Sequence, residues 1–470
     1  MLLREFIFNF EPSIEMMSVR MTSDTPATTL ANAPLSRRHI WIVTVSSMEQ
    51  IIGAGLSTLA GIIIPMINLL LHPELSSGMQ GLAGATGLIG IAVGSPIIGR
   101  MSDKWGYLNF FRACPLIIMA GSLLIFFTNG IWWTIAGLFI TGLGVGGGYS
   151  LDSAYISELM PTKWKTIMVG VAKASSSLGF IGVALVSYFI IKHVDQAKVW
   201  PVLSLTLAGL GLITFLMRFR WAQSPSWCLH KGQQQEALKA VRFFFGNSYT
   251  YNPPQSEPAV KDAGYLSLFK GKNLTKVIFS GIPWACEGVG VYGVGVFLPV
   301  LVMSLGLESP DLTGLPKITD SVIITAIINC FILMGFVCGL LMLRKYSHLN
   351  MLVNGFIFAA VGLAVILLAF LFKLPVIVSL IGFLIFEFCL NVGPHLITFI
   401  IPPHVFDPSQ RAAGNGIAAF LGKVGAIAGV FLMPWLLALG GMKLVLAVCI
   451  AVNVLGAVIA RVFGKKLYKE

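Results

Sequence analysis

The sequence predicts an all-α integral membrane protein with twelve transmembrane helices arranged in two six-helix bundles. Of its 470 residues, 56% are hydrophobic and only 11% are charged, whereas soluble domains carry about 25% charged residues. Twelve apolar runs recur along the chain, and each is long enough to cross a bilayer as a helix of about 20 residues. One long polar stretch, residues 218–275, divides the runs into two sets of six.

The first bundle is expected within residues 39–217, after an N-terminal cytoplasmic tail at residues 1–38. The tail contains acids, prolines and a Ser/Thr/Ala tract, so it lacks the basic start and compact apolar core of a cleavable signal peptide. Six apolar runs follow, and short polar segments separate them. Their bounds are 40–71, 80–99, 109–128, 131–159, 166–191 and 199–217.

The second bundle is expected within residues 276–463, after a central cytoplasmic loop at residues 218–275 that is rich in Lys and Arg. A cytoplasmic tail at residues 464–470 follows it. A weak internal repeat supports two related halves, because SELMPTKWK after the fourth run parallels PHVFDPSQR after the tenth. Duplicated halves of this kind are typical of transporters. The bounds of the six runs are 276–305, 319–343, 350–372, 374–400, 411–438 and 441–463.

The positions of Lys and Arg predict the orientation of the chain. The loops after runs two, four, eight and ten contain Arg100, Lys104, Arg112, Lys163, Lys165, Arg344, Lys345 and Arg411. The opposite loops contain only Lys192, Lys198, Lys317, Lys373 and Lys443. By the positive-inside rule, the first set of loops and both termini are cytoplasmic. We expect a protein of a bacterial inner (plasma) membrane whose net charge of +12 reflects topology and lipid contact, with no nucleic-acid partner.

Four acidic side chains lie inside apolar runs and are candidates for substrate binding or proton coupling. An ionisable group at the centre of a transmembrane helix costs about 2.5–3.5 kcal/mol on insertion scales, so such groups are paired or functional. Burial favours the neutral form of a carboxyl group, which a proton carrier must be able to reach. The acids, one each in runs one, four, seven and ten, are Glu49, Asp152, Glu287 and Glu387.

A lysine and two aromatic side chains complete the candidate site. Lys423 lies in run eleven, and Trp284 and Tyr292 lie on either side of Glu287 in run seven. Aromatic rings at such positions can stack on a ligand or hydrogen-bond to it. Our hypothesis is that Glu287 or Glu49 takes the coupling proton, while Lys423 pairs with a carboxylate until an anionic or polar substrate displaces it.

Three charged residues in these runs also have a structural interpretation. Glu387 can be a satisfied structural acid against neighbouring helices. Asp152 lies six residues before Glu158 and can belong to a cytoplasmic gate. Lys173 in the fifth run can extend toward the cytoplasmic surface on its four-carbon stem.

The segment GRMSDKWG, residues 99–106, is unusually polar for a connection between two apolar runs. We interpret it as a latch in the gate region. In this interpretation Gly99 allows close helix approach, Asp103 accepts bonds from helix ends or arginines, and Gly106 permits a tight turn. A plain polar turn is the alternative. The other charged residues assigned to the gate are Lys104, Glu158, Lys165 and Arg411.

Several motifs resemble those of a known family. GRMSDKWG resembles the G-x-x-x-D-R/K-x-G signature of the major facilitator superfamily, and the six-plus-six layout covers nearly the whole chain. GLGVGGGYSLDSAYISELMP (142–161) and SPSWCLHKG (224–232) are similar to motifs of its sugar porters. GPHLITFIIPPHVFDPSQRAAGNGIAAFLGKVGAI (393–427) resembles its phosphate-proton symporters. The resemblance indicates the branch of sugar porters, phosphate-proton symporters and organic-ion transporters.

This resemblance implies a central cavity lined by helices one, four, seven and ten, which are the helices that hold the four acids. It also implies that Lys423 helps to hold an anion, that Glu287 replaces a substrate-binding glutamine, and that the protein is a monomer. The chain departs from the family at Leu138, where an arginine is usual. It also departs at Gly148, where phosphate symporters usually carry an acid.

The motif content predicts the class of function. No nucleotide-binding or catalytic motif is present in the sequence, so we expect neither an enzyme nor a cofactor. The cysteines include no CxxC pair, and we expect neither a disulfide nor a metal site. We expect a secondary active transporter that moves a small polar or anionic metabolite by alternating access, as a symporter driven by the proton gradient. The alternatives are an uncoupled facilitator or an exporter of the same fold and, further away, a transporter-like solute sensor.

Overall fold

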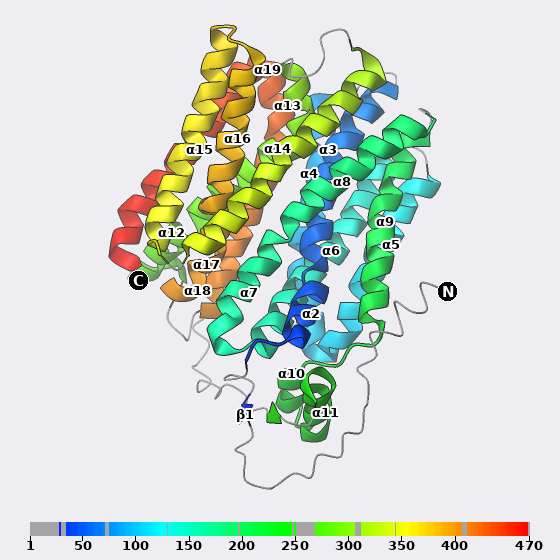
Figure 1. Cartoon of the computed structure of the whole chain (residues 1–470), viewed down its shortest axis with the longest axis vertical. Helices are drawn as coiled ribbons and strands as arrows, with labels where there is room; N and C mark the ends of the chain where they lie inside the picture. The colour runs from blue at the N-terminus through cyan, green and yellow to red at the C-terminus, as the bar shows by residue number, and fades with distance from the viewer. Residues whose placement is uncertain are drawn as a thin grey trace.

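The structure, a computed structural model, consists almost entirely of helices that form two bundles side by side (Figure 1). It confirms the predicted all-α membrane fold. Within the described residues, eleven helical segments are long and apolar enough to span a membrane, and one of them, Gly416–Leu467, has 52 residues and contains a break at Gly441. That segment accounts for two spans. The described residues are 28–29, 34–70, 75–128, 130–195, 198–246, 249–250, 268–305, 312–343, 345–406 and 411–468.

The first bundle contains the six spans that precede the central loop. Spans one and five each consist of two helices, separated at Ser46–Ser47 and at Ser175. The Ser175 hydroxyl donates to the Ala172 carbonyl at 2.6 Å, and such local bonds compete with the regular helix backbone. The helices are α2 (Arg37–Val45), α3 (Met48–Leu70), α4 (Ser77–Trp105), α5 (Tyr107–Phe127), α6 (Ile131–Leu159), α7 (Thr162–Ala174), α8 (Ser176–His193) and α9 (Val199–Phe219).

The second bundle contains six further spans, of which two are irregular. Span seven passes into a π-helix in its glycine-rich part, and such π-bulges are frequent at functional sites. Span ten is broken at Gly393–Pro394, because proline supplies no backbone donor. Gly441, with a φ of +61°, separates spans eleven and twelve. The elements are α12 (Gly271–Gly288), η4 (Val289–Val294), α13 (Leu298–Ser304), α14 (Gly314–Met342), α15 (His348–Leu371), α16 (Val376–Val392), α17 (Pro394–Ile400), α18 (Pro402–Val405) and α19 (Arg411–Leu467).

The described part of the central loop lies at one end of the bundles, which we call the loop end; the opposite end is the far end (Figure 1). The Phe245 ring lies 4.8 Å from the His39 ring, and the Phe244 ring lies 5.2 Å from the Trp221 ring. These contacts anchor the loop helices to the first bundle. The elements at this end are α10 (Pro225–His230), α11 (Gln234–Phe245) and the parallel pair β1 (Thr28–Thr29) and β2 (Tyr249–Thr250).

Glycines of span four allow two helices of the first bundle to pack closely. A Cβ atom at Gly142 of α6 would overlap with the Gly87 carbonyl of α4, and one at Gly146 would overlap with the Ile91 carbonyl. Small residues permit this kind of backbone contact in membrane helices. The glycine run in this span is therefore explained by packing between α4 and α6.

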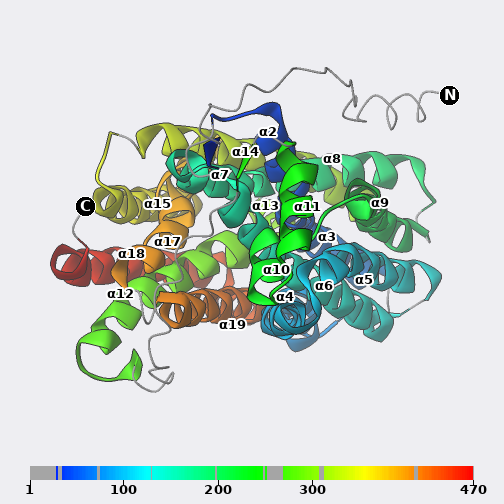
Figure 2. The ribbon, with the colours of Figure 1, turned by 90° about the horizontal axis from the view of Figure 1, so that it is seen from below.

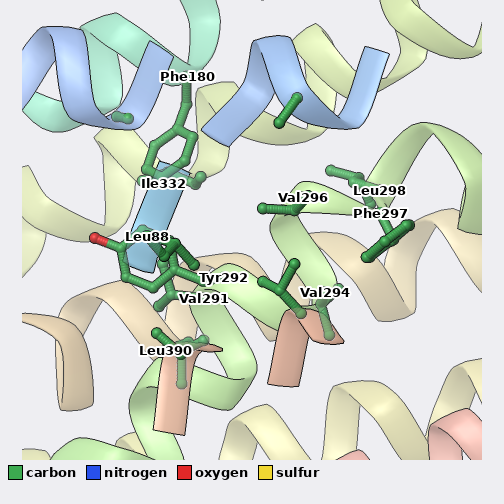
Figure 3. Close-up of a cluster of buried hydrophobic side chains, with 14 of the residues drawn as sticks. Leu88, Phe180, Val291, Tyr292, Val294, Val296, Phe297, Leu298, Ile332 and Leu390 are labelled. Carbon is green, nitrogen blue, oxygen red and sulfur yellow. The ribbon is translucent and has the colours of Figure 1, made fainter. Parts of the chain in front are cut away.

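The two bundles, seen from the loop end in Figure 2, meet along a buried apolar seam. Figure 3 shows part of this cluster, with Leu88 and Phe180 from the first bundle and Tyr292 and Ile332 from the second. The side-chain amide of Asn329 in α14 donates to the Phe180 carbonyl of α8 at 3.3 Å. Because both bundles contribute, motion of one bundle against the other must separate these side chains.

The far halves of the bundles are in close backbone contact. Gly61 of α3 lies against the Val296 carbonyl, and Gly81 of α4 lies against the Phe431 carbonyl of α19. At both positions a Cβ atom would overlap with the facing backbone. The structure is therefore closed between the bundles at the far end.

Two glycines of the GVGVYGVG run (288–295) are expected to differ in their tolerance of alanine. A Cβ atom at Gly288 would lie 2.6 Å from the Gly422 carbonyl oxygen of α19, whereas one at Gly295 would meet no heavy atom within 4 Å. Overpacking a tight contact costs about 1–3 kcal/mol, so we expect G288A to lower the unfolding temperature measured in detergent. G295A is the control and should leave it unchanged. Equal unfolding temperatures for the two variants would contradict this assignment.

Candidate functional site

Glu287 lies in a charged site at the seam, which we call the central site: Lys173, Glu287, His395 and Lys423. Glu287 and His395 are buried, and the two lysines are half-buried. These side chains come from α7, α12, α17 and α19, so both bundles contribute. Only 2% of the Glu287 side chain is exposed, and its Oε1 atom lies 3.5 Å from His395 Nε2. The ammonium groups of Lys173 and Lys423 both interact electrostatically with the Glu287 carboxyl group. The site therefore combines one carboxyl, one imidazole and two amines.

Aromatic rings surround Lys423. Its Nζ atom lies 5.1 Å from the centre of the Tyr292 ring and 5.3 Å from the centre of the Tyr149 ring, within the range of cation–π interactions. The nearby Trp284 packs edge-to-face on Phe399, with 6.0 Å between ring centres. Flat apolar surfaces beside a positive charge suit a ligand that has both a ring and an anionic or polar group.

A series of hydrogen bonds along span ten connects Glu387 to the central site. We call the three residues of this series the polar ladder: Glu387, Asn391 and His395. The Asn391 Nδ2 atom donates to the Glu387 backbone carbonyl at 2.7 Å and lies 3.4 Å from Glu387 Oε2. Asn391 Oδ1 lies 2.7 Å from His395 Nδ1. The ladder thus connects Glu387 to the imidazole that faces Glu287.

Glu49 and Asp152 belong to a second buried site, the arginine cluster, together with Arg218. The three residues are at most 2% exposed. Arg218 donates two hydrogen bonds to the Glu49 carboxylate and one of 3.0 Å to Asp152 Oδ1. It also donates to the backbone carbonyls of Val45 and Phe111, at 3.0 and 3.2 Å. With both acids ionised, the cluster has a net charge of −1 and can become neutral by binding one proton.

The structure shows the surroundings of the two positions at which the chain departs from the family pattern. A Cβ atom at Gly148 would overlap with the Glu49 side chain, so the space that an acid at this position would need is occupied by an acid from the first span. Leu138, where an arginine is usual, is buried and apolar. The expectation that residue 218 begins the central loop is corrected, because α9 continues to Phe219.

A cavity of about 10 Å³ lies between the arginine cluster and the central site. Asp152 of the cluster and Lys173 of the central site both line it. Lys173 is half-buried and lines the space between the two sites. The remaining lining residues are Ser46, Gln50, Ile156, Val169, Ala172 and Phe399.

The segment GRMSDKWG is mostly the last turns of α4, and Gly106 alone connects α4 to α5. Gly106 has a φ of +101°, a left-handed conformation that favours glycine. Its backbone N–H donates to the Ser102 carbonyl at 2.8 Å and closes the helix. A Cβ atom at Gly99 would only touch the Ser150 side chain at 3.5 Å, and the close approach to α6 lies one turn earlier, at Gly94 against Leu143.

The other gate candidates lie around the loop end. Glu158 accepts a 2.6 Å hydrogen bond from the Ser224 hydroxyl and so links α6 to α10. Lys104 and Lys165 are exposed. The side chains of Asp103 and Arg411 lie outside the described residues, so the latch remains a prediction.

Two residues that complete these sites were not among the sequence candidates. Arg218 follows directly on the apolar run 199–217, in the sequence FLMRFR, where a charge marks the apparent end of a span. His395 has a clearer signal, because Glu387, Asn391 and His395 are spaced by four residues and therefore share one face of a helix.

Comparisons with known proteins identify related sequences. The chain matches the family described as sugar (and other) transporter over residues 31–466. The inner membrane metabolite transport protein YgcS of Escherichia coli (strain K12) is 25% identical over 438 residues, which cover 93% of each chain. The arabinose-proton symporter of Bacillus subtilis (strain 168) is 24% identical over 415 residues, which cover 84% of this chain and 86% of that protein.

A solved structure has a similar fold. The inward open conformation of the xylose transporter XylE from E. coli superposes with a TM-score of 0.73 and 18% sequence identity. The superposition covers 92% of this chain and 97% of that chain. The similarity extends over both six-helix bundles.

Proposed function

Because this chain belongs to the sugar (and other) transporter family of the major facilitator superfamily, we propose that it is a secondary active transporter that carries a small polar or anionic metabolite by proton-coupled symport. Members of this family are integral membrane transporters and not enzymes. The two bundles rock about the central site, which faces one side of the membrane at a time. The proton gradient is the energy source, and no cofactor takes part.

The observation that carries this proposal is that Glu287 lies at the seam within electrostatic range of both Lys173 and Lys423. While Glu287 is ionised, it balances one of the two positive charges. When a proton neutralises Glu287, both ammonium groups can attract an anion. A proton and an anionic substrate therefore stabilise each other in the site, and this reciprocal coupling is what symport requires.

The side chains around Lys423 favour a substrate with an anionic or polar group on a flat or ring-shaped body. Tyr149, Tyr292 and Trp284 offer the apolar faces, and Lys423 offers the charge. The relative from B. subtilis is named an arabinose-proton symporter. Its name supports proton coupling in this chain as well.

We place the loop end in the cytoplasm. Lys104, Lys163 and Lys165 are exposed at this end, and Lys465 and Lys466 lie in the last turn of α19. The positive-inside rule assigns such an end to the cytoplasm. Both termini are then cytoplasmic. The family resemblance implies a monomer, and we propose a bacterial plasma membrane as its location, with the bilayer and a small-molecule substrate as partners and without nucleic acid.

The central test is E287Q. Glutamine keeps the size of the side chain but cannot bind and release a proton, so we expect the variant to exchange substrate across proteoliposomes and to lose accumulation driven by a proton gradient. The substrate is first selected by thermal stabilisation against phosphate, sugars, mono- and dicarboxylates, aromatic acids and organic cations. A ligand at about 100 times its dissociation constant adds about 2.7 kcal/mol of stability.

The matched control is E236Q, the same substitution at an exposed residue of α11 that forms a surface ion pair of 2.7 Å with Lys239. It should accumulate substrate like the original protein. Exchange without accumulation in the original protein would instead identify an uncoupled facilitator, and binding without any flux would identify a sensor. Accumulation by E287Q would exclude Glu287 as the proton carrier.

A further inference from the structure

Glu287 and His395 face each other with two atoms that have no hydrogen-bond partner in the part of the chain that the structure describes. The atoms are Glu287 Oε1 and His395 Nε2, which lie 3.5 Å apart. Both side chains are only 2% exposed. A buried polar atom without a partner costs about 1–3 kcal/mol. A shift of about 0.6 Å would bring these two atoms to hydrogen-bond distance, but a bond between them needs a proton on one of them.

The polar ladder determines which nitrogen of His395 carries a proton. The backbone carbonyl of Glu387 can only accept, so the Asn391 atom that lies 2.7 Å from it must be the amide nitrogen. The Asn391 oxygen therefore faces His395 Nδ1, at 2.7 Å, and Nδ1 must be the donor. A neutral His395 then has its proton on Nδ1 and presents a bare lone pair at Nε2 to Glu287.

The charges around Glu287 and His395 allow this pair to bind and release a proton. Lys173 of α7 and Lys423 of α19 interact electrostatically with both Glu287 and His395, and Tyr292 of η4 interacts with Glu287. A bare Nε2 and an ionised Glu287 are two acceptors that cannot bond to each other. One proton removes this mismatch, and the two ammonium groups supply compensating charge when the proton leaves.

We propose that Glu287 Oε1 and His395 Nε2 together bind one proton, and that Asn391 and Glu387 are positioning residues that hold His395 with its own proton on Nδ1. That this proton is the transported one rests on the proposed symport. In one form the proton is bonded to Oε1 and donated to Nε2. In the other form the O–H bond is broken, an N–H bond is formed, and an imidazolium faces a carboxylate. The pair is neutral in both forms and has a charge of −1 after the proton leaves.

Nitrogen NMR of histidine tests the site without any substrate. The full chain, labelled with nitrogen-15 in histidine and placed in lipid nanodiscs, is titrated from roughly pH 8 to pH 5, and H395Q assigns the signal. We expect the neutral His395 to carry its proton on Nδ1 and its Nε2 signal to change during the titration. E287Q should abolish that change. His348, which is bonded to the Tyr468 hydroxyl at 2.8 Å, serves as the internal control that E287Q leaves unaltered.

Two results would overturn the inference: a neutral His395 with its proton on Nε2, or a titration of His395 that E287Q leaves intact. The first is measured on the unsubstituted protein, so a variant that fails to fold does not remove the test. In proteoliposomes, H395Q should lose proton-driven accumulation, while H348Q should retain it. Accumulation by H395Q equal to that of the original protein overturns this inference alone. Absence of accumulation in the original protein overturns the proposed symport, and the NMR result then decides separately whether the pair shares a proton.

Discussion

Replacing Arg218 by methionine is expected to lower the free energy of unfolding by about 3–5 kcal/mol, the typical cost of removing one partner from a buried ion pair. Arg218 is fully buried and is hydrogen-bonded to both Glu49 and Asp152. Methionine fills much of the same volume but donates no hydrogen bond. The two carboxyl groups, which interact with each other, would then lie together in an apolar interior without a cation.

The control for this prediction is R242M, the same substitution at an exposed residue in the last turn of α11. It should change the free energy of unfolding by less than about 0.5 kcal/mol. The triple variant E49Q/D152N/R218M should recover a large part of the loss, because it removes the uncompensated charges together with the guanidinium group. Denaturant titration of the purified variants in one detergent measures these differences. A loss below about 1 kcal/mol in R218M, as for an exposed pair, would show that the cluster is solvated.

The fold was largely predictable because a bilayer restricts the chain to helices of about 20 apolar residues. That restriction makes hydropathy a strong signal, and all twelve predicted runs correspond to helices. The breaks within spans were less predictable. Ser46 and Ser175 interrupt spans one and five, and serine is common in uninterrupted helices, so its presence alone predicts no break. The glycine-rich part of span seven contains a π-helix.

The acidic residues of the candidate sites were predictable, but their partners were not. Intramembrane acids are rare enough to identify by inspection, and this led to the grouping of Glu49, Asp152, Glu287 and Glu387. The structure divides the four acids among the arginine cluster, the central site and the polar ladder. Glu49 and Arg218 are 169 residues apart in the chain. No local periodicity encodes such a pair, and hydropathy assigned Arg218 to a loop because the apolar run ends there.

Glycine motifs predicted close packing between helices, but they did not predict which glycine makes the contact. The GRMSDKWG segment directed attention to Gly99, yet α4 touches the α6 backbone at Gly94. Helix rotation decides which of several glycines faces a neighbour, and neither composition nor spacing specifies that rotation. Gly106 was easier, because a turn of one residue with positive φ strongly favours glycine.

Replacing Gly61 by alanine is expected to reduce turnover by about tenfold to a hundredfold while leaving substrate binding measurable. The added Cβ would overlap with the Val296 carbonyl of the other bundle, and the backbone cannot swing aside as a flexible side chain could. Overpacking of this kind costs about 1–3 kcal/mol, which corresponds to rate changes of this size. Because the contact exists only when the far end is closed, the cost falls on that state alone.

The matched control is G182A in α8, where a Cβ would meet no heavy atom within 4 Å. Flux in proteoliposomes and ligand-induced thermal stabilisation should both be unchanged in G182A, whereas G61A should lose flux and keep stabilisation. If G61A retained full flux, closure at Gly61 would not belong to the transport cycle. If it lost flux and ligand stabilisation together, the far-end-closed state would itself be the form that binds substrate. The expected separation follows from population shift. An alanine that penalises one of two states moves the equilibrium toward the other, which still binds from the far end but reaches the far-end-closed state less often.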